Sequence, residues 1–170
     1  MALDVHKIGY SSSSSRSNRR IKYDVFLCFR GEDTRKCFTD HLHAALQGNG
    51  LTTTFRDEED LERGEDIKTS LLEAIDESFS AVVVLSRNYA NSTWCLDELL
   101  KILHSKKELG LHIFPIFYDV DPSHVRHQTG PFEEAFKQHE MKVSHDKVQR
   151  WREAFIEVAN LAGWNSQDYG

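Results

Sequence analysis

Cysteine is scarce in this sequence, and its three cysteines stand apart at positions 28, 37 and 95. An odd number of cysteines without a CxxC pair argues against a disulfide framework and against a zinc site. No apolar run approaches the roughly 20 residues needed to span a bilayer. The N-terminus also lacks the apolar core of a secretory signal. We therefore expect a protein of a reducing compartment, located in the cytoplasm and also in the nucleus.

Phosphate-binding signatures are missing as well. The chain has no GxxxxGK[ST] motif, and no GxGxxG motif follows its first apolar run, which excludes the usual phosphate cradle and dinucleotide fingerprint. A phosphoacceptor domain needs clustered acids after the first strand and an aspartate after the third. Those positions hold Phe29-Arg30 and Leu85-Ser86, so that function is excluded too.

Basic residues are outnumbered, with 21 Lys and Arg against 27 Asp and Glu and a net charge of −6. A general nucleic-acid binder needs a basic surface to release counterions, so we do not expect nucleic acid as a partner. Hydrophobic residues make up 39% and charged residues 28% of the 170 positions. These values are typical of one globular domain with a full-sized core.

The first 22 residues differ in composition from the rest of the chain. They contain a run of five serines followed by three arginines and few apolar residues, so they cannot bury enough surface to offset their ordering entropy. We predict a disordered tail over residues 1–22, a domain over residues 23–166, and a short tail or linker over residues 167–170. A targeting peptide is the alternative for the first segment, although Asp4 and weak amphipathicity count against it.

From Tyr23 onward, short apolar runs alternate with amphipathic helical patterns. Four runs have strand character: Tyr23–Phe29, Thr52–Phe55, Ala81–Leu85 and Ile113–Tyr118. Helices are predicted after a cap at Asp33 or Thr34, around Ile67–Ile75, from Asn91-Ser92-Thr93 to about Glu108, and over Phe132–Glu140 and Lys147–Ala162. This alternation predicts a parallel sheet between two helical layers. Ala81–Leu85 should lie at its centre, and the strand with Pro115 at or near an edge.

Five stretches of the chain resemble plant TIR domains, the Toll/interleukin receptor homology fold. In chain order they are KYDVFLCFRGEDTR with FTDHL, DEEDLERGEDI, LSRNYANSTWCLDELLKI, IFPIFYDVDPSHVRHQTGPFEEAF and WREAFIEVANLAGW, and together they extend from Lys22 to Trp164. The resemblance implies a flavodoxin-like three-layer α/β fold with a parallel five-stranded sheet. The fifth strand would follow Gly163-Trp164 and the last family helix would come after it, so both are expected to be truncated.

The resemblance also implies an activity, because plant TIR domains are similar to NAD⁺ nucleosidases whose key residue is the Glu of WCLDEL, here Glu98. Ordinary glycosidases need a second carboxylic acid to protonate the leaving group. Nicotinamide leaves NAD⁺ as a neutral molecule, so one carboxylate that stabilises the positive charge on the ribose can suffice. NAD⁺ would be the substrate, with no tightly bound cofactor and no metal.

Helical spacing gives Glu98 weaker, independent support. Trp94 and Ile102 flank it at i−4 and i+4 on one helix face, and an acid within an apolar stripe is unusual; a solvated helix acid is the alternative. Asp97 is predicted to lie at the surface. Cys95 stands near a helix N-terminus, where a nucleophilic thiol is conceivable, but its apolar neighbours favour a buried core thiol.

Five further residues are predicted to line the NAD⁺ cleft: Arg30, Gly31, Ser86, Tyr89 and Trp94. Arg30 can pair with a phosphate, although a salt bridge with Glu32 or Asp33 is the alternative. Gly31 lets the backbone approach a ligand. Trp94 can stack on a ring or pack in the core. The other two are weaker candidates.

Self-association is implied at two surfaces. The first lies on the first helix, where Asp40-His41 stands in place of a Ser-His pair common in the family. The second includes His127–Phe132, with Gly130 as a close-approach position; plain surface is the alternative for both. The loop Arg56–Gly64 resembles the family's BB loop, which gates the cleft and contacts other subunits. Other TIR domains, and the nucleotide-binding and leucine-rich-repeat domains of a receptor, are therefore the expected partners.

Two functions from different classes remain. The first is an enzyme, switched on by oligomerisation, that hydrolyses NAD⁺ to nicotinamide and ADP-ribose-type products and so triggers defence and cell death. The second is a non-catalytic scaffold that recruits other TIR domains. Glu98 within an intact WCLDEL motif favours the enzyme. A module that binds small nucleotides or nucleic acid is a more distant third option.

Overall fold

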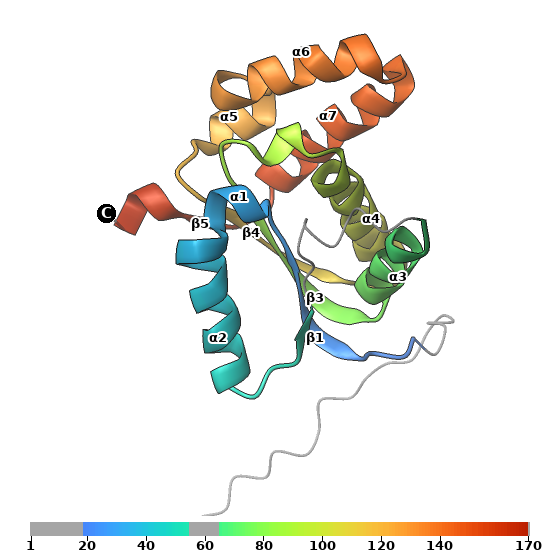
Figure 1. Ribbon diagram of the computed structural model, residues 1–170, viewed down its shortest axis with the longest axis vertical. Coiled ribbons are helices and arrows are strands. Elements are labelled where there is room, and N and C mark those ends of the chain that lie inside the picture. Colours follow the sequence, from blue (N-terminus) through green and yellow to red (C-terminus); the bar gives the residue numbers. More distant parts are fainter. Residues whose placement is uncertain (1–18, 55–64, 170) are drawn as a thin grey trace, which may run out of the picture.

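The computed structural model of the protein describes residues 19–54 and 65–169 (Figure 1). Its strands are β1 (Tyr23–Cys28), β2 (Thr53–Thr54), β3 (Ser78–Leu85), β4 (His112–Phe117) and β5 (Trp164–Asn165). They form one parallel sheet in the order β2-β1-β3-β4-β5. The predicted flavodoxin-like topology is therefore confirmed, with β3 at the centre of the sheet.

Helices follow each strand and lie on both faces of the sheet. They are α1 (Gly31–Thr34), the π-helical turn η1 (Arg35–Thr39), α2 (Asp40–Gly48), α3 (Glu65–Asp76), the 3₁₀ turn η3 (Tyr89–Asn91), α4 (Thr93–Leu109), α5 (Pro122–His127), the 3₁₀ turn η4 (Gly130–Phe132), α6 (Glu133–Lys142), α7 (His145–Ala159) and the 3₁₀ turn η5 (Ser166–Tyr169). In Figure 1, α2 lies on one side of the sheet, and α3, α4 and α7 lie on the other.

Two hydrophobic clusters fill the space between these layers. Because side chains alternate across a strand, Phe26 and Cys28 of β1 enter the larger cluster with α4 and α7. Val25 and Leu27 enter the smaller cluster, against which Leu42 of α2 packs. The central strands are thus buried on both faces, which explains why their sequences are continuously apolar rather than alternating.

Strand β4 lies beside the edge of the sheet, as its proline predicted. Pro115 pairs with Val83 of β3, and the outer neighbour of β4 is the two-residue strand β5. A Cβ at Gly163, just before β5, would lie 2.5 Å from the carbonyl oxygen of Pro115. Only glycine lets the chain come this close to β4, so Gly163 positions the fifth strand.

The local predictions succeeded at α4 and failed at the first helix. Ser92 caps α4 by accepting a hydrogen bond from the Cys95 N–H at 3.2 Å, and Gly110 ends it in a left-handed conformation. The cap predicted at Asp33 or Thr34 is wrong, because both residues lie inside α1. Instead, the Thr34 hydroxyl contacts that of Thr39 at 2.7 Å. Of the predicted second strand, Thr53–Thr54 form β2, whereas Phe55 lies outside the described residues.

Residues on both sides of the predicted domain 23–166 also make contacts with it. The Arg19 guanidinium, within the predicted tail 1–22, donates to the backbone carbonyls of Asp76, Ser78 and Leu109. At the other end, η5 covers part of the expected linker, and the Tyr169 ring stacks on Trp164 with 5.1 Å between centroids. The predicted loop 56–64 lies outside the described residues.

Arg19→Ala is expected to lower the melting temperature by roughly 3–6 °C, because charge-assisted hydrogen bonds contribute about 1–2 kcal/mol. Two of its acceptors are carbonyls of the residues that end α3 and α4, where a cation is favourable. Arg20→Ala is the matched control, since the Arg20 side chain is exposed. Deletion of residues 1–18 should leave the melting temperature nearly unchanged. Equal melting of the Arg19 and Arg20 variants would contradict this role.

Candidate functional site

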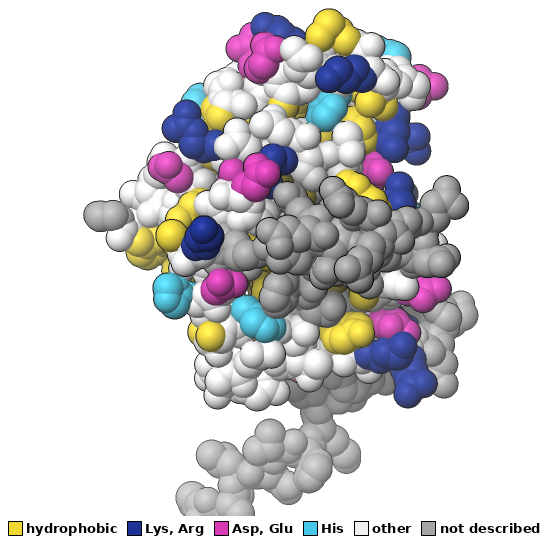
Figure 2. All heavy atoms as spheres, in the orientation of Figure 1, with side chains coloured by type: hydrophobic (Ala, Val, Ile, Leu, Met, Phe, Trp, Pro, Cys, Tyr) yellow, Lys and Arg dark blue, Asp and Glu magenta, His cyan; other side chains and the backbone are white. Residues whose placement is uncertain are grey.

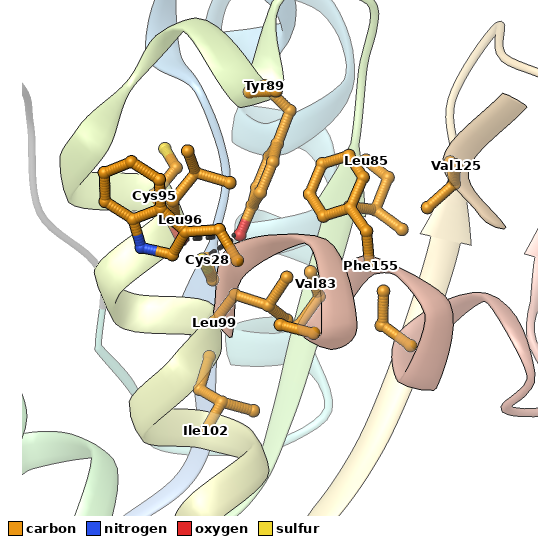
Figure 3. Close-up of a cluster of buried hydrophobic side chains, with 14 of the residues drawn as sticks. Cys28, Val83, Leu85, Tyr89, Cys95, Leu96, Leu99, Ile102, Val125 and Phe155 are labelled. Atoms are coloured by element: carbon orange, nitrogen blue, oxygen red, sulfur yellow. Dashed lines mark hydrogen bonds between the residues drawn. The ribbon is translucent and has the colours of Figure 1, made fainter. Parts of the chain in front are cut away.

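The first turns of α4 are fastened to the carboxyl end of β1. The Cys95 thiol donates to the carbonyl oxygen of Phe29 at 3.6 Å. The Tyr89 hydroxyl donates to the carbonyl oxygen of Cys95 at 2.9 Å and lies 3.1 Å from Sγ of Cys28. Figure 3 shows the Tyr89 side chain extending from η3 toward Cys28 at the edge of the hydrophobic cluster. This anchoring places Glu98, in the second turn of α4, at the strand end where ligands of such sheets bind.

Glu98 is half-buried, whereas its neighbour Leu99 is fully buried. Its negative charge acts on the buried thiol of Cys28, the last residue of β1. The pKa of the Cys28 thiol is well above its usual range, chiefly because the thiol is buried and next because of the negative charge of Glu98. The alternative of a fully solvated helix acid does not match this half-buried position.

Arg30 lies two residues after β1 and is largely buried. Its side chain is 16% exposed and forms a salt bridge with Glu32, with 2.7 Å between Nη2 and Oε2. The salt bridge considered from the sequence is therefore present. Because Glu32 is 72% exposed, the pair is largely solvent-screened and weak. Gly31 starts α1 beside it and is also half-buried.

A hydrogen bond between Ser86 and Asp33 joins the loop after β3 to helix α1, which follows β1. The Ser86 hydroxyl donates to a carboxylate oxygen of Asp33 at 2.5 Å, and Asn88 donates to Asp33 through its backbone N–H at 2.9 Å and its side-chain amide at 3.0 Å. Ser86 is only 1% exposed. Its hydroxyl serves this internal contact, and Asp33 organises it through three hydrogen bonds, a role that neither helix capping nor an ion pair with Arg30 predicts.

Tyr89 is fully buried, and burial raises the pKa of its hydroxyl well above the usual range. Its hydroxyl already contacts Cys95 and Cys28. A direct contact between Tyr89 and a ligand does not fit this placement. The residue instead supports the turn of α4 that carries Glu98. No sequence pattern indicates this role, because it depends on where the hydroxyl lies in the folded protein.

Trp94 and Asp97 both lie in the first turns of α4, and both are close to Lys68. Trp94 is half-buried, packs against the larger hydrophobic cluster, and has the Lys68 ammonium 5.7 Å from its ring centroid. The prediction that Asp97 lies at the surface is wrong, because its side chain is only 18% exposed. Asp97 accepts from the Trp151 indole at 3.1 Å and pairs with Lys68 at 3.2 Å and Lys147 at 3.4 Å. It therefore links α3, α4 and α7.

The residues predicted for self-association lie on separate elements. Asp40 and His41 open α2 and are exposed, and the His41 ring contacts the carbonyl oxygen of Cys37. Gly130 has a φ of 56°, and a Cβ there would lie 2.7 Å from Nδ1 of His124. The close approach at Gly130 is thus to His124 of the same chain, and it requires glycine.

Charged side chains of both signs are intermixed on the face of the protein in Figure 2. Within residues 19–54 and 65–169, no three His, Cys, Asp or Glu side chains are grouped so that they could hold a metal ion. No helix in the same ranges is long and apolar enough to cross a membrane.

Comparison with known proteins gives consistent matches. The family model described as TIR domain matches residues 22–169. Disease resistance protein RPV1 of Vitis rotundifolia is 57% identical over 93% of this chain and 11% of its own length, and TMV resistance protein N of Nicotiana glutinosa is 53% identical over 89% and 13%. The chain thus spans about an eighth of such relatives. The TIR domains of the activated Roq1 resistosome, which directly recognises the pathogen effector XopQ, match with a TM-score of 0.78 and 51% identity over 86% of this chain and 89% of that one.

Proposed function

The chain belongs to the TIR domain family, and we propose that it acts in plant immune signalling as a self-associating enzyme that hydrolyses NAD⁺ with Glu98 as the central carboxylate. The observation that carries this proposal is the position of Glu98. It is half-buried on a helical turn that is hydrogen-bonded to the carboxyl end of β1. Similarity to disease resistance proteins supports the signalling role. The test is nicotinamide release from NAD⁺, compared with a Glu98 variant.

One carboxylate is sufficient for this reaction. As the bond between C1′ of the ribose and nicotinamide breaks, its electron pair neutralises the pyridinium ring, and the leaving group needs no proton. Positive charge develops on the ribose, where the Glu98 carboxylate stabilises it and accepts hydrogen bonds from the ribose hydroxyls. Water then bonds to C1′ and releases a proton, which leaves ADP-ribose and nicotinamide.

The surrounding residues divide into ligand contacts and supports. Arg30 is proposed to exchange its weak pair with Glu32 for a phosphate of NAD⁺, with Gly31 allowing close approach. Trp94 is proposed to stack on a ring of the substrate. Ser86 and Tyr89 act through the contacts that hold the neighbouring loops. NAD⁺ is a substrate, and no resident cofactor is required.

Assembly is proposed to control this activity. The Roq1 TIR domains belong to an activated resistosome, and the exposed Asp40-His41 pair and the segment around Gly130 are the proposed contact surfaces here. The partners would be other TIR domains and the remaining domains of a receptor, in the cytoplasm and the nucleus. A non-catalytic scaffold is the alternative, and a Glu98→Ala protein that still assembles and signals would favour it.

The isolated domain is expected to be mostly monomeric in dilute solution and to associate weakly as its concentration rises. His41→Ala should reduce this association because it removes an exposed ring from α2. His145→Ala is the matched control, since His145 is exposed at the start of α7. Light scattering over a concentration series is the measurement. A tight dimer at all concentrations, or equal effects of the two substitutions, would contradict the prediction.

A further inference from the structure

The Asp33 carboxylate holds a turn of the chain that lies far from it in sequence. The turn runs from Ser86 to Tyr89 and is closed by a hydrogen bond from the Tyr89 N–H to the carbonyl oxygen of Ser86 at 3.1 Å. One oxygen of Asp33 accepts from the Ser86 hydroxyl at 2.5 Å and from the Asn88 backbone N–H at 2.9 Å, and the other accepts from the Asn88 side-chain amide at 3.0 Å. Asp33 therefore binds two residues of one turn at once.

These contacts fix a helix that has little stability of its own. Asp33 lies in α1, which is only four residues long, and its partners Ser86 and Asn88 lie 53 and 55 positions further along the chain. A single helical turn is not stable without tertiary contacts. An ionised carboxylate is a strong acceptor, and this one is half-buried beside a hydroxyl that is 1% exposed. The position of α1 therefore depends on this link.

The two linked segments lead to different parts of the proposed NAD⁺ site. On one side, Arg30, the proposed phosphate contact, lies between β1 and the helix that carries Asp33. On the other side, the turn ends at Tyr89, whose hydroxyl donates to the carbonyl oxygen of Cys95 at 2.9 Å (Figure 3). Cys95 lies in the first turn of α4, and Glu98 follows one turn later. A chain of hydrogen bonds thus joins the two parts of the site.

We infer that Asp33 is a positioning residue of the NAD⁺ site, because it fixes the spacing between Arg30 and Glu98. It acts through Ser86 and Asn88, to which both of its oxygens are directed. A substrate held by its phosphate at a wrong spacing would place its ribose away from Glu98, and such a misplacement slows the chemical step. The catalytic part of this inference rests on the proposed NAD⁺ hydrolysis.

The kinetic test compares two aspartates at opposite ends of the sheet. Asp33→Ala should lower kcat by about tenfold while KM changes by less than about threefold, both measured below the melting temperature. Asp24→Ala is the matched control, because Asp24 is also half-buried and accepts a backbone N–H, from Thr52 at 2.7 Å, at the amino end of β1. It should keep the wild-type kcat. Equal losses of kcat in the two variants, or wild-type kcat in Asp33→Ala, would overturn the inference.

Hydrogen exchange of the Asn88 backbone N–H, followed by NMR, tests the link without any activity. Its acceptor is Asp33, so Asp33→Ala should speed this exchange by at least about fivefold, whereas Asp24→Ala should leave it unchanged. An unchanged rate in Asp33→Ala would overturn the inference whatever the activity. Faster exchange, in a protein whose wild type does not cleave NAD⁺, would support the link and refute the proposed function. The two failures are thus distinguishable.

Discussion

Glu98→Gln is expected to lower NAD⁺ cleavage by at least about a hundredfold, while folding and association persist. The substitution keeps the shape and the hydrogen-bonding capacity of the side chain but removes the charge that stabilises the ribose in the transition state. Because Glu98 is half-buried, loss of its charge also removes a desolvation cost, so the melting temperature should stay equal or rise slightly. Cleavage rates and thermal melting of the same preparations measure both effects.

Asp97→Asn is the control for this prediction, because it removes a neighbouring carboxylate on the same helix. Nicotinamide needs no general acid, so a second carboxylate should be dispensable for the reaction. The variant keeps an oxygen that can accept from the Trp151 indole, and it should retain most activity below its melting temperature. Equal loss of activity in the two variants, or full activity in Glu98→Gln, would rule out the mechanism.

Asp97→Ala is expected to destabilise the fold by about 2–3 kcal/mol and to lower the melting temperature by roughly 4–12 °C. Trp151 is 1% exposed, so its indole N–H would be left buried without its acceptor. The ion pairs of Asp97 with Lys68 and Lys147 contribute less to the free energy of unfolding, because the two lysine side chains are 45% and 35% exposed.

Urea unfolding of Asp97→Ala and Asp97→Asn measures this difference. The asparagine variant should lose only about 1 kcal/mol, because it keeps the acceptor and loses the ion pairs. An Asp97→Ala protein within about 0.5 kcal/mol of the wild type would show that the link between α3, α4 and α7 is unimportant for stability.

Local patterns predicted the elements whose signals lie within a few residues. The apolar run Ala81–Leu85 marked the central strand, and Ser92 marked the start of α4. Pro115 placed its strand near the edge because it lacks an N–H. The prediction of Glu98 as a site residue depended on the family resemblance, because helical spacing alone does not distinguish a site residue from a solvated acid.

The errors concern side chains whose partners are distant in the chain. Asp97 meets Trp151 across 54 positions, and Asp33 meets Ser86 across 53. Such contacts depend on how α4 and α7 are rotated against each other and on how α1 meets the loop after β3. Neither periodicity nor capping preference contains that information. For the same reason, the sequence could not show that Tyr89 supports the site from within the core.

The most direct test is to incubate concentrated wild-type protein with NAD⁺ and identify the products by mass spectrometry. Nicotinamide should appear in the same molar amount as the NAD⁺ lost, together with an ADP-ribose-type product. The rate per molecule should rise with protein concentration, because assembly is proposed to activate the site. If NAD⁺ stays intact at concentrations where light scattering shows association, the protein is not the proposed enzyme.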